Sequence, residues 1–580
     1  MAPIALTGTG HAAAPAPGSD DVEYEVLSVA TQDPLGIDVA PDGRVLWTER
    51  EGTLNVLKPD GSQVVAGHLP VSAGAYGGAL PCATCTQPET KSLEEGGLYS
   101  VLVAKDFMKT GRIYLYRSIP GSENPTSSMG TWRLSTFVLD PASNSLDLSS
   151  EKKILEVPAE WEHCCHYGGD LNWLPDGTIL LSVGDDVPAT SSGGYGPRDT
   201  SERWLNAELT AQNPADRRGK VLRLMPDGSV PDGRTKGIRA NPFLGKVGYN
   251  PYIVHNPAYP KSSPFAYVPG RGGSKASHTI PYDPYIYSLG YKQPFKGSVD
   301  PRTGTAYFAD VGPDASADDP LKGSKGFDER DVIPPGGGVN HGWPRCIANN
   351  KAYGDYDWVK SKFMGFLSCK GMTPAVFYYP HDASKEWPQV GTGGTTGLPV
   401  AVYPERPKGA LALPARFHHK LIDVEFSRNW LATFPIKADG AIDTKHFKIE
   451  SPLRSAATGS SQAVCGPNLY ITQPCVTGAL QNPINATVGP DGALYILEYG
   501  GGYYHSVGAK LGRLKCTGCQ PSSLDYAGHP AVKTSHATPV RVHSGGDDPF
   551  GPYRAPALVV LGLIAIALMA RAPRRRVVWA

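Results

Sequence analysis

The chain has 580 residues, and its 55 basic and 55 acidic side chains give a formal net charge of zero. Phosphate binding needs a basic surplus, so no nucleic-acid partner is expected. The 67 glycines and 54 prolines predict many turns and exclude a fold built on long helices. Residues 1–21 are expected to form a disordered arm. They lack the basic start and the apolar core of a signal peptide, so the export route stays open.

A strand–turn–strand pattern recurs along the chain. Each copy has Asp-Gly or Thr-Gly at the turn and an acidic residue at the end of its second strand, and glycine accepts the positive φ that tight hairpins need. Repeated hairpins of this kind predict four-stranded units arranged as an all-β propeller. The four copies are VAPDGRVLWTER from Val39, WLPDGTILLSVGD from Trp173, VDPRTGTAYFADVG from Val299 and VGPDGALYILEYG from Val488.

One globular domain is predicted over residues 22–520, with long loops that carry the site. These loops are expected at 186–216, 232–280, 313–328 and 345–400. A polar, Gly- and Pro-rich linker follows at 521–554. Residues 555–570 are apolar, and the basic tail 571–580 comes directly after them. This order predicts a C-terminal membrane-spanning helix with a cytoplasmic tail and an extracytoplasmic domain.

The ten cysteines fall into five pairs that are close in sequence. An even set at short spacings predicts local disulfides and an oxidising compartment. The alternative is a zinc site built from the two CxxC motifs, which are far apart in the chain. Disulfides are favoured. The pairs are Cys82/Cys85, Cys164/Cys165, Cys346/Cys369, Cys465/Cys475 and Cys516/Cys519.

His166 is the first candidate for chemistry. A neutral imidazole can accept a proton near neutral pH, and the following Gly168–Gly169 pair lets another molecule approach the backbone. A histidine that is only hydrogen-bonded in a loop is an equal alternative. A metal site with Cys164 and Cys165 is disfavoured, because ligating cysteines are usually separated by about two to four residues. A vicinal disulfide that stiffens the loop is favoured instead.

Two further stretches offer charged groups. Seven carboxylates lie between Phe308 and Val332 in a loop rich in Gly and Pro. With backbone carbonyls they form hard oxygen ligands that suit Ca²⁺, and a solvated acidic loop is the alternative. Lys292 and Gln293 follow a predicted strand. The lysine is a candidate to bind an anionic ligand, although a surface lysine is the commoner case.

Seven motifs in this order resemble the glucose/sorbosone dehydrogenase family, the soluble quinoprotein sugar dehydrogenases. The resemblance covers about residues 25–515. It implies a six-bladed β-propeller with pyrroloquinoline quinone (PQQ) over the central axis, sitting on Ca²⁺. The motifs are LGIDVAPDGRVLWTEREG, EEGGLYSVLVAKDF, HCCHYGGDLNWLPDGTILLSVGDD, RRGKVLRLMPDGSVPDG, IYSLGYKQPFKGSVDPRTGTAYFADVGPDA, GFDERDVIPPGGGVNHGWP and NPINATVGPDGALYILEYG.

The resemblance also implies roles for single residues. The family's general base aligns with His166, which would take the proton of the sugar's anomeric hydroxyl while hydride passes to the quinone. Glu95 and Asp328 match polar cofactor contacts. Arg428 lies where the family presents basic groups to the PQQ carboxylates.

Three residues match the family's metal ligands. The carbonyls of Gly312 and Pro313 align with those that hold the cofactor's calcium. Glu329 aligns with a ligand of a second, structural calcium. The resemblance thus implies PQQ and Ca²⁺ as cofactors.

Lys292 and Gln293 stand where the family usually has Arg and Asn, and Val311 stands where Gln or His often contacts the cofactor. Lysine keeps the positive charge but loses the planar fork of arginine. The favoured hypothesis is oxidation of an aldose or related sugar by an exported enzyme with an unidentified electron acceptor. The alternatives are a propeller without the cofactor that binds carbohydrate or protein at the cell surface, and a Ca²⁺-dependent hydrolase or lactonase using His166 and the acids.

Overall fold

The computed structural model describes residues 22–72, 95–119, 129–160, 165–188, 191–450, 454–455, 480–501, 506–516 and 519. The chain divides into two units, residues 1–530 and 531–580, and every described residue lies in the first. The predicted arm, the predicted linker and the predicted anchor at 555–570 with its tail therefore lie outside the described residues. Within the described ranges, no helix has the length and apolar character needed to span a membrane.

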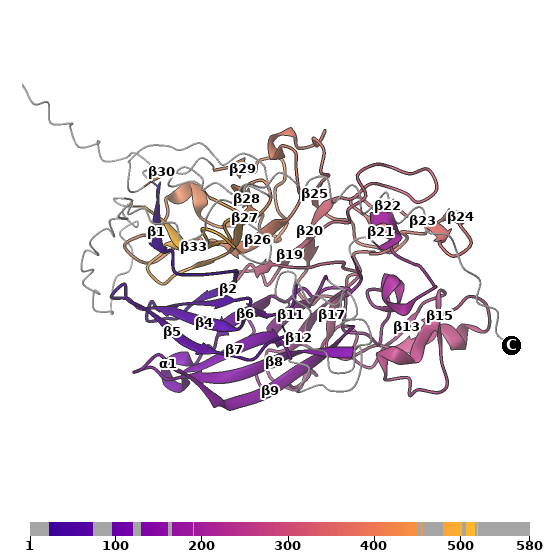
Figure 1. Cartoon of the computed structure of the whole chain (residues 1–580), viewed down its shortest axis with the longest axis horizontal. Helices are drawn as coiled ribbons and strands as arrows, with labels where there is room; N and C mark the ends of the chain where they lie inside the picture. The colour runs from indigo at the N-terminus through magenta and orange to yellow at the C-terminus, as the bar shows by residue number, and fades with distance from the viewer. Residues whose placement is uncertain are drawn as a thin grey trace, which may run out of the picture. The chain divides into compact units, whose positions relative to one another are not determined.

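The predicted β-propeller is confirmed, with six blades (Figure 1). Five blades follow one another along the chain, each an antiparallel sheet whose strands pair in sequence order. The first blade is β2 (Pro34–Val39), β3 (Val45–Glu49), β4 (Thr53–Leu57) and β5 (Gln63–His68), and the second is β6 (Leu98–Val103), β7 (Arg112–Ser118), β8 (Met129–Leu139) and β9 (Leu146–Glu160). The third is β10 (Leu171–Trp173), β11 (Ile179–Val183), β12 (Lys220–Leu224) and β17 (Ile286–Leu289), and the fourth is β18 (Gly297–Val299), β19 (Ala306–Asp310), β20 (Asp328–Ile333) and β25 (Phe377–Tyr379). The fifth is β26 (Gly397–Val402), β27 (Lys420–Glu425), β28 (Trp430–Pro435) and β29 (Lys448–Ile449).

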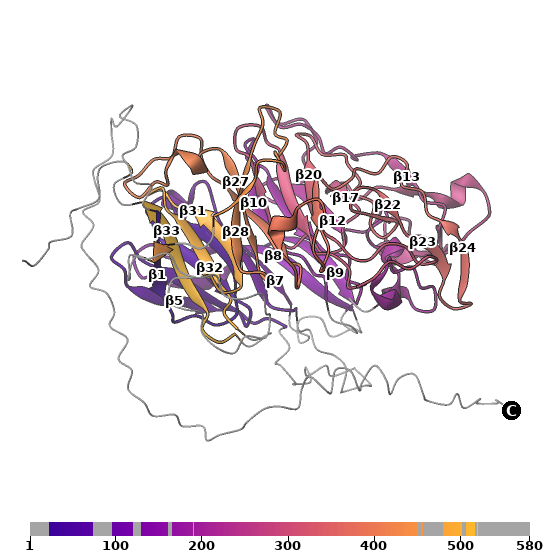
Figure 2. The same ribbon diagram turned by 90° about the horizontal axis from the view of Figure 1, so that it is seen from above.

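The sixth blade joins the two ends of the domain. Its strands β31 (Pro483–Val488), β32 (Leu494–Glu498) and β33 (Lys510–Cys516) are completed by β1 (Val22–Ser28) from the start of the domain. β1 pairs antiparallel with β33, and the short β30 (Arg454–Ser455) adds a parallel edge to β1. Figure 2 shows β1 beside β31–β33. Pairing the two ends in one sheet closes the ring of blades and leaves only short edges exposed.

The four predicted hairpins join the first two strands of their blades. The turns at Asp42–Gly43 and Asp176–Gly177 lie between β2 and β3 and between β10 and β11, and both glycines have φ near +90°. The other two turns connect β18 with β19 and β31 with β32. In the described part of the chain, the α-helical content is one turn, α1 (Phe107–Thr110), in agreement with the expected absence of long helices.

The loops predicted at 186–216, 232–280 and 345–400 contain short elements of their own. Four two-stranded sheets form there: β13 (Val247–Tyr249) with β16 (Thr279–Pro281), β14 (Ile253–His255) with β15 (Tyr267–Pro269), β21 (Cys346–Ile347) with β22 (Lys351–Ala352), and β23 (Gly354–Asp357) with β24 (Lys362–Phe366). The 3₁₀ turns in these loops are η1 (Ser191–Gly194), η2 (Arg203–Leu205), η3 (Ala207–Leu209), η4 (Pro264–Ala266), η5 (Lys275–His278) and η6 (Pro388–Val390), whereas η7 (Ala415–Phe417) lies between β26 and β27. The outer blade strand β25 lies inside the segment 345–400 that was predicted to be a loop. It was not predicted because three residues are too few to show the alternating pattern of a strand.

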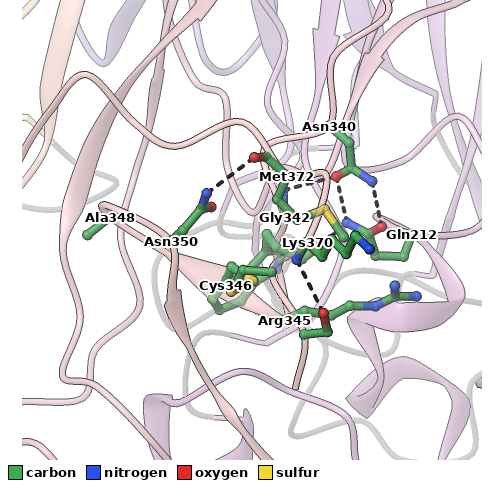
Figure 3. Close-up of a disulfide and its surroundings, with 12 residues drawn as sticks. Gln212, Asn340, Gly342, Arg345, Cys346, Ala348, Asn350, Lys370 and Met372 are labelled. Atoms are coloured by element: carbon green, nitrogen blue, oxygen red, sulfur yellow. Dashed lines mark hydrogen bonds between the residues drawn. A yellow bond between two sulfur atoms is a disulfide. The ribbon is translucent and has the colours of Figure 1, made fainter. Parts of the chain in front are cut away.

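Two predicted disulfides are confirmed. Cys346, at the start of β21, bonds to Cys369, three residues after β24 ends (Figure 3). Cys516 bonds to Cys519, which excludes that CxxC motif from a zinc site. Cys165 is also disulfide-bonded. Its predicted partner Cys164, and the pairs Cys82/Cys85 and Cys465/Cys475, lie outside the described residues.

Candidate active site

A cavity of about 440 Å³ opens where the innermost strands of all six blades begin. Every blade contributes a lining residue at, or just before, the start of its first strand. Such a position is where a propeller presents side chains from several blades to one ligand. These six residues are Leu35, Tyr99, His166, Phe295, Thr396 and Ile484.

His166 lines this cavity and has defined partners on both ring nitrogens. Its Nδ1 lies 3.0 Å from Asp185 Oδ1, and its Nε2 lies 2.9 Å from Lys292 Nζ. Asp185 is held in turn by the Trp343 indole, whose Nε1 donates to Oδ2 at 2.6 Å. All four side chains are buried, so the ring has one orientation.

The donor and acceptor chemistry assigns the tautomer. A carboxylate only accepts, so His166 Nδ1 carries the proton toward Asp185. The Lys292 ammonium only donates, so His166 Nε2 is the acceptor. The imidazole is therefore neutral, with its basic nitrogen directed into the cavity and bonded to Lys292.

Glu95 and Gln293 hold the backbone on either side of this imidazole. Glu95 Oε2 accepts from the His166 amide at 2.6 Å and from Gln293 Nε2 at 3.1 Å. Gln293 Oε1 accepts from the Gly168 amide at 2.7 Å. Both predicted residues thus line the cavity, and the side chain of each also accepts a hydrogen bond from the backbone of the histidine loop.

The Gly-Gly pair serves packing between strands. His166 itself has φ of 63°, a left-handed conformation that is costly for a residue with a side chain. A Cβ on Gly168 would lie 2.6 Å from the Gly184 amide, and one on Gly169 would lie 2.8 Å from the Tyr99 ring. Glycine at these positions brings the His166 loop against its neighbours, which sets the height of the imidazole in the cavity.

The predicted calcium loop has one of its two carbonyl residues at the cavity. Gly312 lines it, whereas Pro313 is not among the lining residues, and its oxygen packs against Gly326. Asp328 is fully buried behind this loop. It accepts from the Gly312 amide at 3.3 Å and from Arg330 Nη1 at 2.8 Å, so it positions the loop without lining the cavity.

Arg428 also lies behind the cavity wall. Its guanidinium donates to the carbonyls of Pro380, Gly391 and Gly394, among others, at 2.7–3.0 Å. The side chain therefore ties down the 380–394 loop, which contributes His381 and Gly394 to the lining. Arg428 would therefore affect a bound cofactor indirectly, by holding this loop in position.

A buried acidic cluster lies beside the cavity. Ligand atoms of Asp310, Glu329 and Asp331 lie within 4.8 Å of one another. Burial and the Asp331 carboxylate raise the pKa of Asp310 and of Glu329. Both carboxylate oxygens of Asp331 lack a hydrogen-bond donor, and His341 Nδ1 lies 3.1 Å from one of them. The cluster thus gathers three of the seven carboxylates that the sequence placed in this stretch.

The sequence analysis missed two cavity residues, Arg50 and His381; Asp314 was one of the seven candidate carboxylates, but its place in this cavity was not predicted. Arg50 follows the acidic residue that ends β3, so the repeated hairpin pattern carried a signal for it. His381 and Asp314 lie in long loops, where one sequence has no period that would place them.

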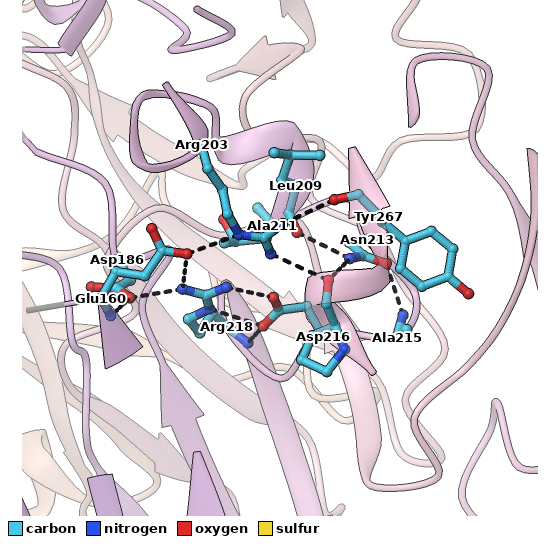
Figure 4. A network of polar contacts seen from close by, with 12 residues as sticks. Glu160, Asp186, Arg203, Leu209, Ala211, Asn213, Ala215, Asp216, Arg218 and Tyr267 are labelled. Atoms are coloured by element: carbon cyan, nitrogen blue, oxygen red, sulfur yellow. Dashed lines mark hydrogen bonds and ion pairs between the residues drawn. The ribbon is translucent and has the colours of Figure 1, made fainter. Parts of the chain in front are cut away.

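An ion-pair network lies behind the site loop (Figure 4). Arg218 Nη1 donates to Asp186 at 2.9 Å, and Arg218 Nη2 donates to Asp216 at 2.7 Å. Glu160 Oε1 accepts from Arg218 Nη1 at 3.3 Å and from Arg203 Nε at 3.0 Å, so Arg203 joins the network through Glu160. Asp186 directly follows Asp185, so the network fixes the backbone that presents the histidine's partner.

Comparison with known proteins agrees with the propeller fold and with the family resemblance of the sequence. The family model described as glucose/sorbosone dehydrogenase matches residues 31–255, and this confirms the resemblance predicted from the sequence. The matched segment contains His166 and Asp185, and it ends before Lys292 and the acidic cluster.

An uncharacterised protein of Synechocystis sp. (strain ATCC 27184 / PCC 6803 / Kazusa) is 25% identical over 320 residues, or 55% of this chain. The match spans 58% of that relative's length. A solved glucose dehydrogenase superimposes with a TM-score of 0.50 at 18% identity, covering 85% of this chain and 99% of its own, and shows the fold. The PQQ-bound aldose sugar dehydrogenase of Streptomyces coelicolor aligns with a TM-score of 0.47 at 15% identity, covering 86% and 99%.

Proposed function

We propose that this protein is a PQQ- and Ca²⁺-dependent dehydrogenase that oxidises an aldose or related sugar at its anomeric carbon. The observation that carries the proposal is the Asp185–His166 pair, whose basic Nε2 faces a cavity on the propeller axis. A positioned imidazole backed by a buried carboxylate is the arrangement of a general base. The match to the glucose/sorbosone dehydrogenase family supports the same reaction class.

The cavity residues fit a flat, anionic cofactor. The volume of about 440 Å³ is in the range of small-molecule and cofactor sites. Lys292 and Arg50 supply positive charge, and Tyr99, Phe295 and Phe426 supply aromatic surface. When bound, PQQ would accept hydride at a quinone carbonyl and Ca²⁺ would polarise that carbonyl.

The chain's own residues would handle the proton. His166 Nε2 takes it from the anomeric hydroxyl, and the Asp185 carboxylate stabilises the imidazolium that results. Lys292 must first leave Nε2. Its ammonium can then turn toward negative charge elsewhere in the cavity, which gives the lysine a part in orienting the cofactor.

Two calcium sites belong to the proposal. Gly312 would supply a carbonyl to the ion beneath the cofactor, and the Pro313 carbonyl would have to turn away from Gly326 to join it. Glu329, with Asp310 and Asp331, would hold a structural ion. Their buried carboxylates are hard oxygen donors whose charge a divalent cation would neutralise.

The alternative is a propeller that has lost PQQ and binds carbohydrate or protein at a cell surface. Its specific support is the 2.9 Å contact between Lys292 and His166, which occupies the basic nitrogen, together with the apolar Val311 in the lining. In that case Lys292 and His166 form a fixed polar pair.

The disulfides support an oxidising, extracytoplasmic location for the domain. Anchoring through residues 555–570 is part of this proposal.

A titration of the full-length protein with PQQ, with and without Ca²⁺, tests the function. Ca²⁺-dependent binding followed by a sugar-dependent change in quinone absorbance is expected, with glucose and other aldoses as substrates. Sugar binding without turnover, and no PQQ binding at micromolar concentration, would favour the cofactor-free propeller.

A further inference from the structure

A second cavity, of about 300 Å³, lies among the insertions in the third and fourth blades. Its walls come from residues 198–208, from the β14–β15 hairpin with the residues that follow it, and from the β23–β24 hairpin. None of its lining residues belongs to the axial cavity. β13, β23 and β24 lie at the same end of the first unit in both ribbon views (Figures 1 and 2). The proposed reaction leaves this cavity without a role.

Charged side chains in its walls are paired with one another. Arg198 donates to Glu208 at 3.2 Å and to Asp355 at 2.9 Å, and Arg271 also donates to Asp355. Arg198, Glu208 and Asp355 are each more than nine-tenths buried. Burial alone would raise the pKa of Glu208, but the guanidinium groups of Arg345 and Arg198 outweigh it and lower the pKa to about 2. Glu208 is therefore ionised at neutral pH, and its ion pairs hold this wall in a fixed arrangement.

The Tyr252 ring makes cation–π contacts with three arginines of the same network. The guanidinium carbons of Arg198, Arg271 and Arg345 lie 4.2, 4.9 and 4.9 Å from its centroid. Such contacts hold the planar groups in fixed positions. The β23–β24 hairpin lies between Cys346 and Cys369 in the sequence, so their disulfide joins the two ends of the segment that forms this wall.

The charge balance narrows the class of ligand. Two lining cations, Arg198 and Arg271, face three lining carboxylates, Glu208, Asp355 and Asp357. The lining has no surplus of positive charge, so it does not favour an anion. Guanidinium groups already bond to Glu208 and Asp355, so these carboxylates do not form a free set of oxygen ligands for a metal ion. An apolar ligand would desolvate these charges without replacing their hydrogen bonds.

The remaining wall is suited to a molecule with many hydroxyl groups. Thr200 and Asn206 add neutral donors and acceptors, while Tyr356 and Met364 add a partly exposed apolar surface. Phe366, two residues along β24 from Met364, is 58% exposed. Hydroxyl groups both donate and accept, and the C–H faces of a sugar ring pack on aromatic side chains, so a neutral saccharide matches both properties.

We propose that this cavity is an accessory binding site for a neutral saccharide chain, separate from the axial site where oxidation takes place. Arg271 is its exposed contact, because its side chain is 48% exposed while its partner Asp355 is buried. The site would hold an oligosaccharide or polysaccharide near the enzyme.

The test is calorimetric titration of the full-length protein, without PQQ so that no turnover occurs, with cellotriose and maltotriose as probes. Arg271→Ala and Tyr356→Ala remove contacts of the second cavity, and His381→Ala is the matched variant in the axial cavity. We expect at least one trisaccharide to bind, with affinity falling about tenfold or more in the first two variants and unchanged in the third.

Binding that survives in Arg271→Ala and Tyr356→Ala but is lost in His381→Ala would overturn the proposal, as would no binding of either probe at millimolar concentration. Oxidation of glucose and other aldoses by the PQQ-loaded protein is measured in parallel. Normal oxidation with no trisaccharide binding rejects the accessory site alone, while trisaccharide binding without oxidation supports it and rejects the dehydrogenase.

Discussion

Lys292 Nζ and His166 Nε2 lie 2.9 Å apart at the floor of the axial cavity, so the lysine occupies the nitrogen that a general base must use. Asp185 fixes the opposite ring nitrogen at 3.0 Å. The three side chains are connected in the order Asp185–His166–Lys292, and the ammonium has to move before the imidazole can accept a proton. A cofactor carbonyl or carboxylate that attracts Lys292 would therefore also release the base.

His166→Ala is expected to reduce dye-linked sugar oxidation by about 10²–10⁴-fold while PQQ remains bound, since loss of a general base costs about that factor. His446→Ala, at an exposed histidine outside the cavity lining, is the control and should change turnover little. Turnover is followed with an artificial electron acceptor, and bound PQQ by its absorbance. Retained turnover in the His166 variant would remove the histidine from the mechanism.

Asp185→Asn is expected to lower kcat with a smaller effect on PQQ affinity. The carboxamide can accept at only one of its two positions: with its oxygen toward Trp343, its NH₂ faces Nδ1 and favours the tautomer in which Nε2 carries the proton, and with its oxygen toward Nδ1 it loses the indole donor. Trp343→Phe is the graded comparison, because it keeps the carboxylate and removes only the indole donor at 2.6 Å. Steady-state kinetics should rank the wild type above Trp343→Phe and that variant above Asp185→Asn. Equal activity in all three would show that Asp185 does not position the base.

Lys292→Arg is expected to tighten PQQ binding, and Lys292→Met to weaken it by about tenfold or more, because the planar guanidinium can donate two parallel bonds to a carboxylate or quinone oxygen. Gln293 is left unchanged, since its side chain bonds both Gly168 and Glu95. Kd is measured by absorbance titration in the presence of Ca²⁺. The same affinity for all three proteins would mean that Lys292 does not touch the cofactor.

Removal of Ca²⁺ by a chelator is expected to lower the Tm, because Asp310, Glu329 and Asp331 are buried within 4.8 Å of one another and repel without a cation. An ion present at about a hundred times its Kd contributes about 2.7 kcal/mol. Asp331→Asn should reduce this difference in Tm between Ca²⁺ and chelator. A Tm that does not respond to the chelator in the wild type would argue that the cluster holds no ion.

The propeller was predictable because its signal is local and repeated. Each Asp-Gly turn defines a hairpin by itself, and four copies along the chain define the architecture. The order of motifs also brought out His166, Glu95, Lys292 and Gln293, which do share one cavity.

The direction in which a side chain points was harder to predict from the sequence than the fold. Arg428 and Asp328 lie at positions that match cofactor contacts, yet they bond to the backbone and to ion-pair partners behind the wall. Arg50 and His381 reach the same cavity from segments more than 300 residues apart in the chain, a meeting that depends on blade closure and loop path. The hairpin pattern marks the position of Arg50 within its own blade, but no period in the sequence encodes the closure of the blades or the path of the loop that carries His381.

Glu425 is expected to make stability fall as the pH rises from about 4.5 to about 7. Burial raises the pKa of its carboxyl from 4.5 to about 7, although the Thr396 and Arg428 amides donate to it. Below about pH 4.5 the group is protonated in both the folded and the unfolded protein. Between the two pKa values the folded state holds a proton that the unfolded state has released, so increasing pH favours unfolding until about pH 7, where the effect ends.

Glu425→Gln removes this titration and should flatten the pH dependence by about 3 kcal/mol over that interval, measured as the difference in unfolding free energy from the wild type. The absolute stability also falls, because the amide nitrogen meets a backbone N–H, so the slope is the informative quantity. Glu202→Gln changes an exposed glutamate and is the control. If denaturant unfolding at pH 4.5, 5.5 and 7 shows the same slope for Glu425→Gln and the wild type, the carboxyl is ionised in the folded protein throughout, and the hydrogen bonds from Thr396 and Arg428 outweigh its burial.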